Sequence, residues 1–183
     1  MDFNYRIFQA IYSFTGKSPV LDAFGIFLAE YLPYFLIAGI FFLIFSYDGW
    51  RKRGMLAVFF IFPLILSRGI IGYLINFFFP IDRPFVVLDF VPLVGQAVSP
   101  AFPAGYAVIF FTLAFVLFFV NRVWGWVYFL GASVVSLGQI FVGAHWPLDI
   151  LGGILVALMS MSISWYLLYQ YLRKIIFSGS EVS

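Results

Sequence analysis

Long apolar runs, broken by short polar stretches, extend along almost the whole chain. A helix needs roughly 20 mostly apolar residues to cross about 30 Å of hydrocarbon. Runs of about that length predict five transmembrane helices, at residues 20–45, 55–79, 103–120, 124–142 and 148–172. The expected fold is therefore an all-α integral membrane protein, a bundle of five transmembrane helices.

Two segments outside these runs have patterns of their own. In residues 1–16, apolar side chains recur at helical spacing opposite polar ones, which predicts an amphipathic helix too short to cross a membrane. We expect this helix to lie in the membrane interface. The proline-rich residues 80–102 predict a short-helix or loop insertion on one face of the bundle. Residues 1–174 then form a single membrane domain, and residues 175–183 form a short polar tail.

The composition agrees with a membrane protein and removes several classes of function. Hydrophobic residues make up 64% of the chain and charged residues 10%, against about 25% charged residues in an ordinary soluble domain. The net charge of +2 gives no reason to expect a nucleic-acid partner. Without cysteine, thiolate metal sites and cysteine nucleophiles are excluded, and one histidine beside one carboxylate does not make a metal site. We therefore expect neither a metal nor a cofactor.

The basic residues predict the orientation of the bundle. Positively charged loops stay on the cytoplasmic side of a membrane. Because five spans alternate sides, residues 51–53, Arg122 and residues 173–174 share one face, which is then cytoplasmic and includes the C-terminus. The N-terminal helix, residues 80–102 and His145 lie on the opposite, outer face.

Polar residues converge on the outer face at four places. These are Asn76 with Asp82 to Pro84, Pro103 to Tyr106 at the start of the third span, Gly138 and Gln139 near the end of the fourth, and His145 with Asp149. A spacing of four puts His145 and Asp149 on one helical face, and a helix N-terminus at Gly105 is an anion site. Each feature alone also fits a structural role, as an anchor, a turn or a helix contact. Their common depth is what indicates a functional site.

The order and spacing of these features resemble the type-2 phosphatidic acid phosphatase family, which also includes vanadium haloperoxidases and bacterial undecaprenyl-diphosphate phosphatases. The family pattern is Lys, six residues, Arg-Pro; then Pro-Ser-Gly-His; then Ser-Arg, five residues, His, three residues, Asp. Asn76 to Pro84, Pro103 to Tyr106 and Gly138 to Asp149 keep those spacings. The short chain looks most like the undecaprenyl-diphosphate phosphatases. That resemblance implies a bacterial cytoplasmic membrane, with the site on its periplasmic or extracellular face.

The resemblance also implies roles for the residues that match. His145 would attack phosphorus to form a phosphohistidine, and Asp149 would orient its ring and stabilise the developing positive charge. Arg83 would bind phosphate oxygens, and backbone N–H groups at Gly105 and its neighbours would add fixed dipoles. The implied ligand is the phosphate or diphosphate headgroup of a membrane lipid, such as undecaprenyl diphosphate or phosphatidic acid.

Four motif positions depart from the family pattern. Asn76 stands in place of the lysine, Ala104 of the phosphate-binding serine, Tyr106 of the proton-donating histidine and Gln139 of the second arginine. Charge stabilisation dominates phosphoryl transfer, and a single arginine contact changes its rate by a factor of about a thousand or more. The departures therefore predict a phosphatase whose activity is weakened or lost. Tyr106 is a substitute acid, although a phenol is a weaker acid than an imidazolium at neutral pH.

Three functions remain open from the sequence alone. Weak phosphatase activity fits a diphosphate substrate, because a leaving lipid phosphate is a weak base that needs little help from an acid. The first alternative is a membrane protein that binds a lipid phosphate without cleaving it. The second alternative is a structural partner of another membrane protein. That function does not explain why Arg83, His145 and Asp149 match the family pattern. The identity of the lipid and the oligomeric state are left open.

Arg68 lies in the middle of the second predicted span, where an arginine is costly and needs a polar partner. Counting about 1.5 Å per residue from the outer ends of the first two spans puts Glu30 and Arg68 at a similar depth. We expect these two residues to form a structural ion pair. The alternative is that Arg68 supplies the missing phosphate-binding cation, which the roughly 12 Å along the helix axis between Arg68 and Asn76 opposes.

Overall fold

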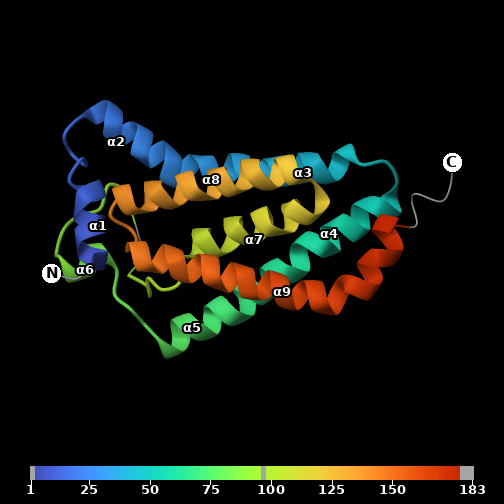
Figure 1. Ribbon diagram of the computed structural model, residues 1–183. Helices are drawn as coiled ribbons and strands as arrows, with labels where there is room; N and C mark the ends of the chain where they lie inside the picture. Colours follow the sequence, from blue (N-terminus) through green and yellow to red (C-terminus); the bar gives the residue numbers. More distant parts are fainter. Residues whose placement is uncertain (1–2, 96–97, 178–183) are drawn as a thin grey trace.

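A computed structural model describes residues 3–95 and 98–177, with side chains described as far as Leu168, and its regular elements are all helices. Figure 1 shows their arrangement. The elements are α1 (Phe3–Tyr12), α2 (Pro19–Ile26), the π-helical η1 (Phe27–Tyr31), α3 (Leu32–Ser46), α4 (Trp50–Leu64), the π-helical η2 (Ile65–Ile71), α5 (Gly72–Phe78), α6 (Pro84–Val87), α7 (Gly105–Val120), α8 (Arg122–Phe141) and α9 (Pro147–Phe177). Most of the expected polar tail, residues 178–183, lies outside the described residues, as do the side chains of Arg173 and Lys174.

Four of these helical stretches are long and apolar enough to span a membrane. One is formed by α2, η1 and α3 over Pro19–Ser46, and a second by α4, η2 and α5 over Trp50–Phe78. The others are α8 and the Pro147–Leu168 part of α9. The expected third span is α7, a shorter apolar helix of 16 residues. The all-helical membrane architecture is thus confirmed, and the expected count of five spans is approximate because α7 is short.

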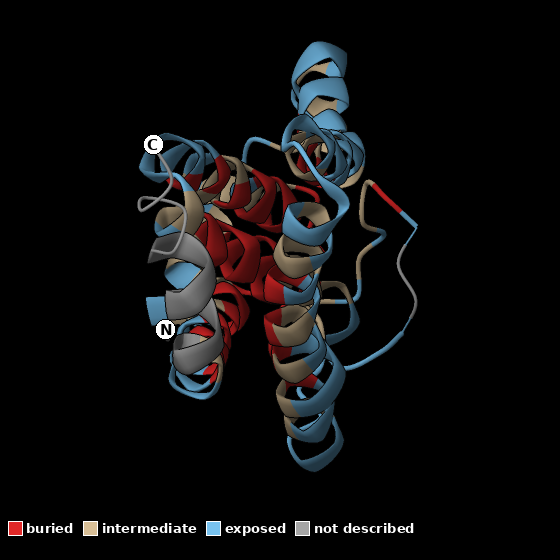
Figure 2. Ribbon diagram, turned by 90° about the vertical axis from the view of Figure 1, so that its right-hand side faces the viewer, coloured by how far each residue is buried: buried red, intermediate tan, exposed pale blue. Residues whose placement is uncertain are grey.

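The centre of the bundle is α7. It packs mainly against α8 and α9, and it has buried residues on all sides, among them Val108, Phe111 and Leu117. Figure 2 shows the buried segments gathered in the middle of the molecule and the exposed positions on the outer helices. Because protein rather than lipid surrounds α7, its length of about 24 Å does not have to match the thickness of the membrane.

Small residues let the central helices approach closely. A Cβ added to Gly138 on α8 would lie 2.9 Å from the backbone nitrogen of Ala29 on η1. A Cβ added to Gly153 on α9 would lie 2.7 Å from the Cβ of Ala107 and 3.1 Å from the backbone oxygen of Ala104. All three distances are shorter than ordinary van der Waals contacts. A larger residue at either position would push two helices apart.

The N-terminal helix α1 lies across the end of the bundle that also carries α6 and the turn between α8 and α9 (Figure 1). Its Phe8 is fully buried, and the Phe8 ring centre lies 4.9 Å from that of Trp146 and 5.1 Å from that of Tyr12. The Asn4 side chain accepts a hydrogen bond of 3.0 Å from the N–H of Leu148, in the first turn of α9. The amphipathic helix that the sequence predicts therefore packs on the protein and covers the turn before α9.

Gly153→Ala should destabilise the protein, because the added Cβ would push α9 away from the first turn of α7. Gly54→Ala is the matched control, since Gly54 is also helical and a Cβ there would meet no heavy atom within 4 Å. We expect the melting temperature in detergent to fall for Gly153→Ala, with an overpacking cost of about 1–3 kcal/mol. For Gly54→Ala it should stay the same or rise. Equal melting temperatures would contradict the close packing of α7 on α9.

Candidate active site

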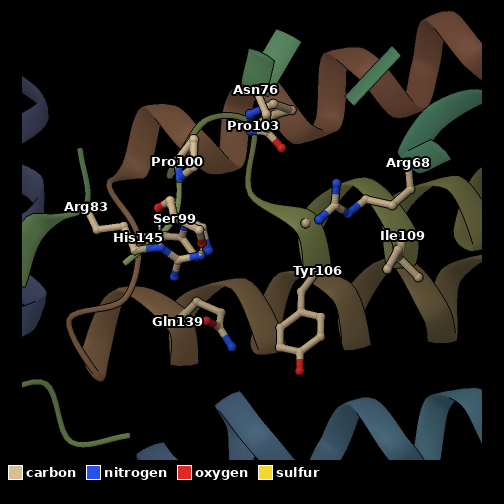
Figure 3. A pocket seen from close by; sticks show the side chains of 11 residues that line it. Arg68, Asn76, Arg83, Ser99, Pro100, Pro103, Tyr106, Ile109, Gln139 and His145 are labelled. Carbon is tan, nitrogen blue, oxygen red and sulfur yellow. Dashed lines mark hydrogen bonds between the residues drawn. The ribbon is translucent and has the colours of Figure 1, made fainter. Parts of the chain in front are cut away.

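A pocket of about 290 Å³ opens at the end of the bundle where α1 lies. In Figure 3, Arg83 and His145 lie at one end of this pocket and Arg68 at the other, with Pro103 and Tyr106 between them. Six of the expected site residues line it, namely Asn76, Arg83, Gly105, Tyr106, Gln139 and His145. Ala104 and Asp149 are buried behind its wall. The polar positions that the sequence places at one depth are thus brought to one cavity.

The turn into α9 brings His145 and Asp149 together. Gly143 has a φ of +82°, which a glycine adopts without strain, and lets the chain reverse before Pro147 begins α9. The Nδ1 atom of His145 lies 3.4 Å from Oδ2 of Asp149, and the same oxygen accepts a hydrogen bond of 2.8 Å from the N–H of Trp146. Both side chains are buried. The carboxylate therefore holds the imidazole in one orientation at the pocket wall.

The surroundings of His145 favour its neutral form. Burial lowers the pKa of His145, and the nearby Arg83 cation lowers it further. Asp149 and a hydrogen bond to the backbone of Ala101 oppose this shift without reversing it. A neutral imidazole is the form that attacks an electrophile, so the ring is in its reactive state at neutral pH.

Hydrogen bonds to Ser99 and Ala144 hold Arg83 at the pocket. Its Nε donates to the backbone oxygen of Ser99 at 3.0 Å and its Nη2 to the Ser99 hydroxyl at 3.2 Å, while Nη1 donates to the backbone oxygen of Ala144 at 3.4 Å. These contacts tie α6 to the turn before His145. The sequence did not single out Ser99, and the only signal for it is that Ser99 is the one polar side chain between Val98 and Phe102.

The start of α7 presents backbone N–H groups to the pocket. Its N-cap residue, Ala104, has no side-chain acceptor, and the N–H of Ala104 itself donates to the backbone oxygen of Asp149 at 3.0 Å. The N–H groups in the first turn of α7, beginning at Gly105, therefore receive no hydrogen-bond acceptor from the side chain of Ala104. Such groups, together with the positive end of the helix dipole, bind anions.

Two positions that depart from the family pattern carry amides that bind backbone. The Asn76 side chain donates a hydrogen bond to the backbone oxygen of Phe102. The Gln139 side chain, which is 1% exposed, donates one of 2.9 Å to the backbone oxygen of Ala29 on η1. Each amide therefore fixes one wall of the pocket and supplies no positive charge to it.

Tyr106 lines the pocket, but its hydroxyl does not face His145. Figure 3 shows the hydroxyl pointing away from Arg83 and His145, towards the helices of the N-terminal third of the chain. Glu30 on η1 acts electrostatically on it. The structure therefore does not bring the expected substitute acid to the expected nucleophile.

Arg68 lies at the pocket, and this differs from the structural role that the sequence favoured. A Cβ added to Gly105 would lie 3.1 Å from Nε and 3.5 Å from Cζ of Arg68, so the guanidinium lies against the start of α7. Among the described residues, no ion pair or hydrogen bond of the Arg68 side chain is found, and the expected pair with Glu30 stays a prediction. Arg68 reaches the pocket because α7 is short and begins at the level of Arg68 in the bundle.

This set of groups can bind and attack a phosphorus centre. A neutral imidazole, a fixed carboxylate, two guanidinium groups and a helix N-terminus meet at one cavity. Among the described residues there is no group of three or more histidine, cysteine or acidic side chains that would hold a metal ion. The chemistry that the site offers is therefore that of a side-chain nucleophile and fixed positive charge.

Comparison with known proteins gives a consistent family. The family model described as the PAP2 superfamily matches residues 57–173. A protein named undecaprenyl-diphosphatase BcrC, from Bacillus subtilis strain 168, is 30% identical over 162 residues, which cover 85% of this chain and 79% of that relative.

Two solved structures have a similar fold. The crystal structure of Aquifex aeolicus LpxE matches with a TM-score of 0.74 at 27% identity, over 91% of this chain and 96% of that one. A PAP2-type phosphatidylglycerolphosphate phosphatase from Bacillus subtilis matches in fold, with a TM-score of 0.61 at 22% identity over 91% and 85% of the two chains. Since the family model covers more than half of the sequence, the chain belongs to the PAP2 superfamily.

Proposed function

We propose that the protein is a membrane lipid phosphatase that acts on a lipid diphosphate of the undecaprenyl diphosphate type, with His145 as its nucleophile. The observation that carries this proposal is the buried, neutral His145, oriented by Asp149 at the wall of a pocket that Arg83 also lines. The name of the Bacillus subtilis relative supports the diphosphate substrate.

The proposed reaction has two steps. The imidazole of His145 attacks the terminal phosphorus, an N–P bond forms, and the P–O bond to the lipid monophosphate breaks. Asp149 stabilises the imidazolium that develops, while Arg83 and the first-turn N–H groups of α7 bind the phosphoryl oxygens. Water then attacks the phosphohistidine, the N–P bond breaks, and inorganic phosphate and free His145 are released.

A diphosphate suits this site better than a phosphomonoester. The leaving group of a monoester is an alkoxide, which needs a proton donor, whereas a lipid monophosphate leaves as a weak base. The Tyr106 hydroxyl points away from His145 (Figure 3), so it supplies no proton in this geometry. With Ala104 in place of a phosphate-binding serine, we expect turnover that is slow but depends on His145.

A lipid-phosphate-binding protein without turnover is the second candidate. The observation that favours it is that the Tyr106 hydroxyl points away from His145 (Figure 3), while Arg83 and the start of α7 would still hold a phosphate. The two candidates differ in whether phosphate is released.

The orientation and the extent of the domain belong to the same proposal. The connections at residues 47–49 and at Asn121 lie at the end of the bundle opposite to His145 (Figure 1). Arg51, Lys52, Arg53 and Arg122 adjoin those connections, so the positive-inside rule puts that end in the cytoplasm. The pocket then faces the outer side of a bacterial cytoplasmic membrane, in a single membrane domain over residues 1–174.

His145→Ala should abolish phosphate release from undecaprenyl diphosphate, since it removes the imidazole that attacks phosphorus in the proposed reaction. We expect purified wild-type protein in detergent to release phosphate and His145→Ala to lose at least about a thousandfold in rate. Arg6→Gln, on α1 and outside the pocket lining, is a control that keeps the activity. Turnover that survives in His145→Ala would rule out this nucleophile. If wild-type protein releases no phosphate but binds the lipid through Arg83, the binding function is the correct one.

The pH profile should report the depressed pKa of His145. The nucleophile must be unprotonated, so kcat/KM should stay level as the pH falls through 6.5 and should decline only below that value. In Asp149→Asn, the carboxylate that raises the pKa is gone, so the decline should move to still lower pH while the rate drops. A decline centred above pH 6.5 would contradict the environment described for His145.

Tyr106→His should restore a proton donor at the start of α7 and should help one substrate more than the other. We expect hydrolysis of phosphatidic acid to rise about a hundredfold, the size of a typical general-acid contribution. Hydrolysis of undecaprenyl diphosphate should change much less, because its leaving group needs little protonation. Phosphate release from both lipids by the two proteins is the measurement. An equal gain on both lipids would show that leaving-group basicity does not set the substrate preference.

A further inference from the structure

Arg68 is a charged side chain that neither the family motifs nor the mechanism above uses. It lies on η2, in the middle of the Trp50–Phe78 span, and its side chain is exposed rather than buried among neighbours. A guanidinium at this depth cannot face lipid at acceptable cost and has to face a polar cavity. The cavity that it faces is the active-site pocket (Figure 3).

The contact that Arg68 makes there is electrostatically unfavourable by itself. Its guanidinium lies against Gly105, with Nε 3.1 Å from where a Cβ on that residue would be. Gly105 begins α7, so a positive side chain adjoins the positive end of a helix dipole. Among the described residues no carboxylate is recorded in an ion pair with Arg68. An anion between the guanidinium and the first-turn N–H groups would turn this repulsion into attraction on both sides.

The backbone around Arg68 is built to hold it in this place. The Ser67 hydroxyl accepts a buried hydrogen bond of 3.1 Å from the hydroxyl of Thr112 on α7. The N–H of Gly72 donates to the backbone oxygen of Ser67, five residues earlier, which is the π-helical pattern. π-Helical segments such as η2 are rare in proteins overall, but a large share of them occur at functional sites. The π-turn and the Ser67–Thr112 bond together fix the direction in which Arg68 leaves η2.

The two amides that depart from the family pattern explain why another cation is needed. Asn76 donates to Phe102 and Gln139 donates to Ala29, so each amide has one N–H engaged by backbone, and neither amide carries charge. Without Arg68, the phosphate pocket would contain a single cationic side chain, Arg83, among the described residues. That is little charge for a ligand that carries two or more negative charges.

We propose that Arg68 is a phosphate-binding residue of this pocket and that it takes over the charge of the motif lysine whose position Asn76 occupies. The guanidinium and the first-turn N–H groups of α7 bind the same phosphoryl group from two sides, and Arg83 binds it from the His145 side. This assignment rests on the proposed function for the identity of the lipid, but phosphate binding by Arg68 does not require turnover.

Binding of inorganic phosphate to the His145→Ala protein tests this assignment without any catalysis. Arg68→Gln in that background should raise the Kd for phosphate about tenfold or more, the effect of losing one charge-assisted hydrogen bond. Arg68→Lys keeps the charge and loses the planar fork of donors. Its Kd for phosphate should therefore lie between that of the His145→Ala parent and that of Arg68→Gln in the same background. Arg51→Gln, in the first turn of α4 and outside the pocket lining, is the matched control and should bind as the parent does.

The double variant Arg68→Gln with Asn76→Lys separates a binding role from a structural one. A lysine at the motif position should recover phosphate affinity if the pocket needs the charge, whereas it cannot repair a packing defect on η2. Unchanged phosphate affinity in Arg68→Gln would overturn the proposal. If Arg68→Gln does not fold, unchanged phosphate affinity in Arg68→Lys would overturn it instead. Loss of affinity in Arg68→Gln without recovery in the double variant would overturn it as well.

The same variants in the wild-type background distinguish a failure of this inference from a failure of the proposed function. If phosphate affinity depends on Arg68 but wild-type protein releases no phosphate from lipid, Arg68 is a binding residue of a non-catalytic protein. If His145-dependent turnover is present and Arg68→Gln changes neither KM nor phosphate affinity, the phosphatase stands and the role of Arg68 falls.

Discussion

The first turn of α7 and the start of α9 hold each other in place, and the whole pocket depends on this contact. The N–H of Ala104 donates to the backbone oxygen of Asp149 at 3.0 Å, and Gly153 lets the two helices approach to backbone contact. The contact fixes the carboxylate that orients His145. It also fixes the uncapped N–H groups at Gly105. His145 and the N–H groups at the start of α7 are therefore positioned by a single helix crossing.

The four departures from the family motifs fall into two physical kinds. Asn76 and Gln139 exchange a charge for an amide, and each amide hydrogen-bonds a backbone oxygen in a wall of the pocket. Ala104 and Tyr106 remove a hydroxyl and an acid from the start of α7, and no described group facing His145 replaces that acid (Figure 3). Charge can be supplied from another position, as we propose for Arg68, because Coulomb forces act over several ångströms. A proton donor has to touch the leaving oxygen.

Much of the fold and part of the site could be predicted from the sequence. The apolar runs gave the spans to within a few residues, because the cost of exposing backbone and charge to lipid leaves helices as the main solution. The motif spacings identified the residues at the pocket, since His145 comes four residues before Asp149 in the first turn of α9 and Arg83 comes soon after the end of α5. Ser99 gave no comparable signal, because its role is a contact between two irregular segments.

The sequence by itself determined which segments form the long apolar helices, which end of the bundle carries the polar groups, and that His145 has a carboxylate four residues away. These properties follow from composition and from spacing along one helix. Only the tertiary structure decided where Arg68 and the Tyr106 hydroxyl point, and which backbone oxygens bind Asn76 and Gln139. Those depend on where α7 begins between its neighbours, and that position is set by contacts such as Gly153 against Ala104 and Ala107 rather than by any pattern along the chain.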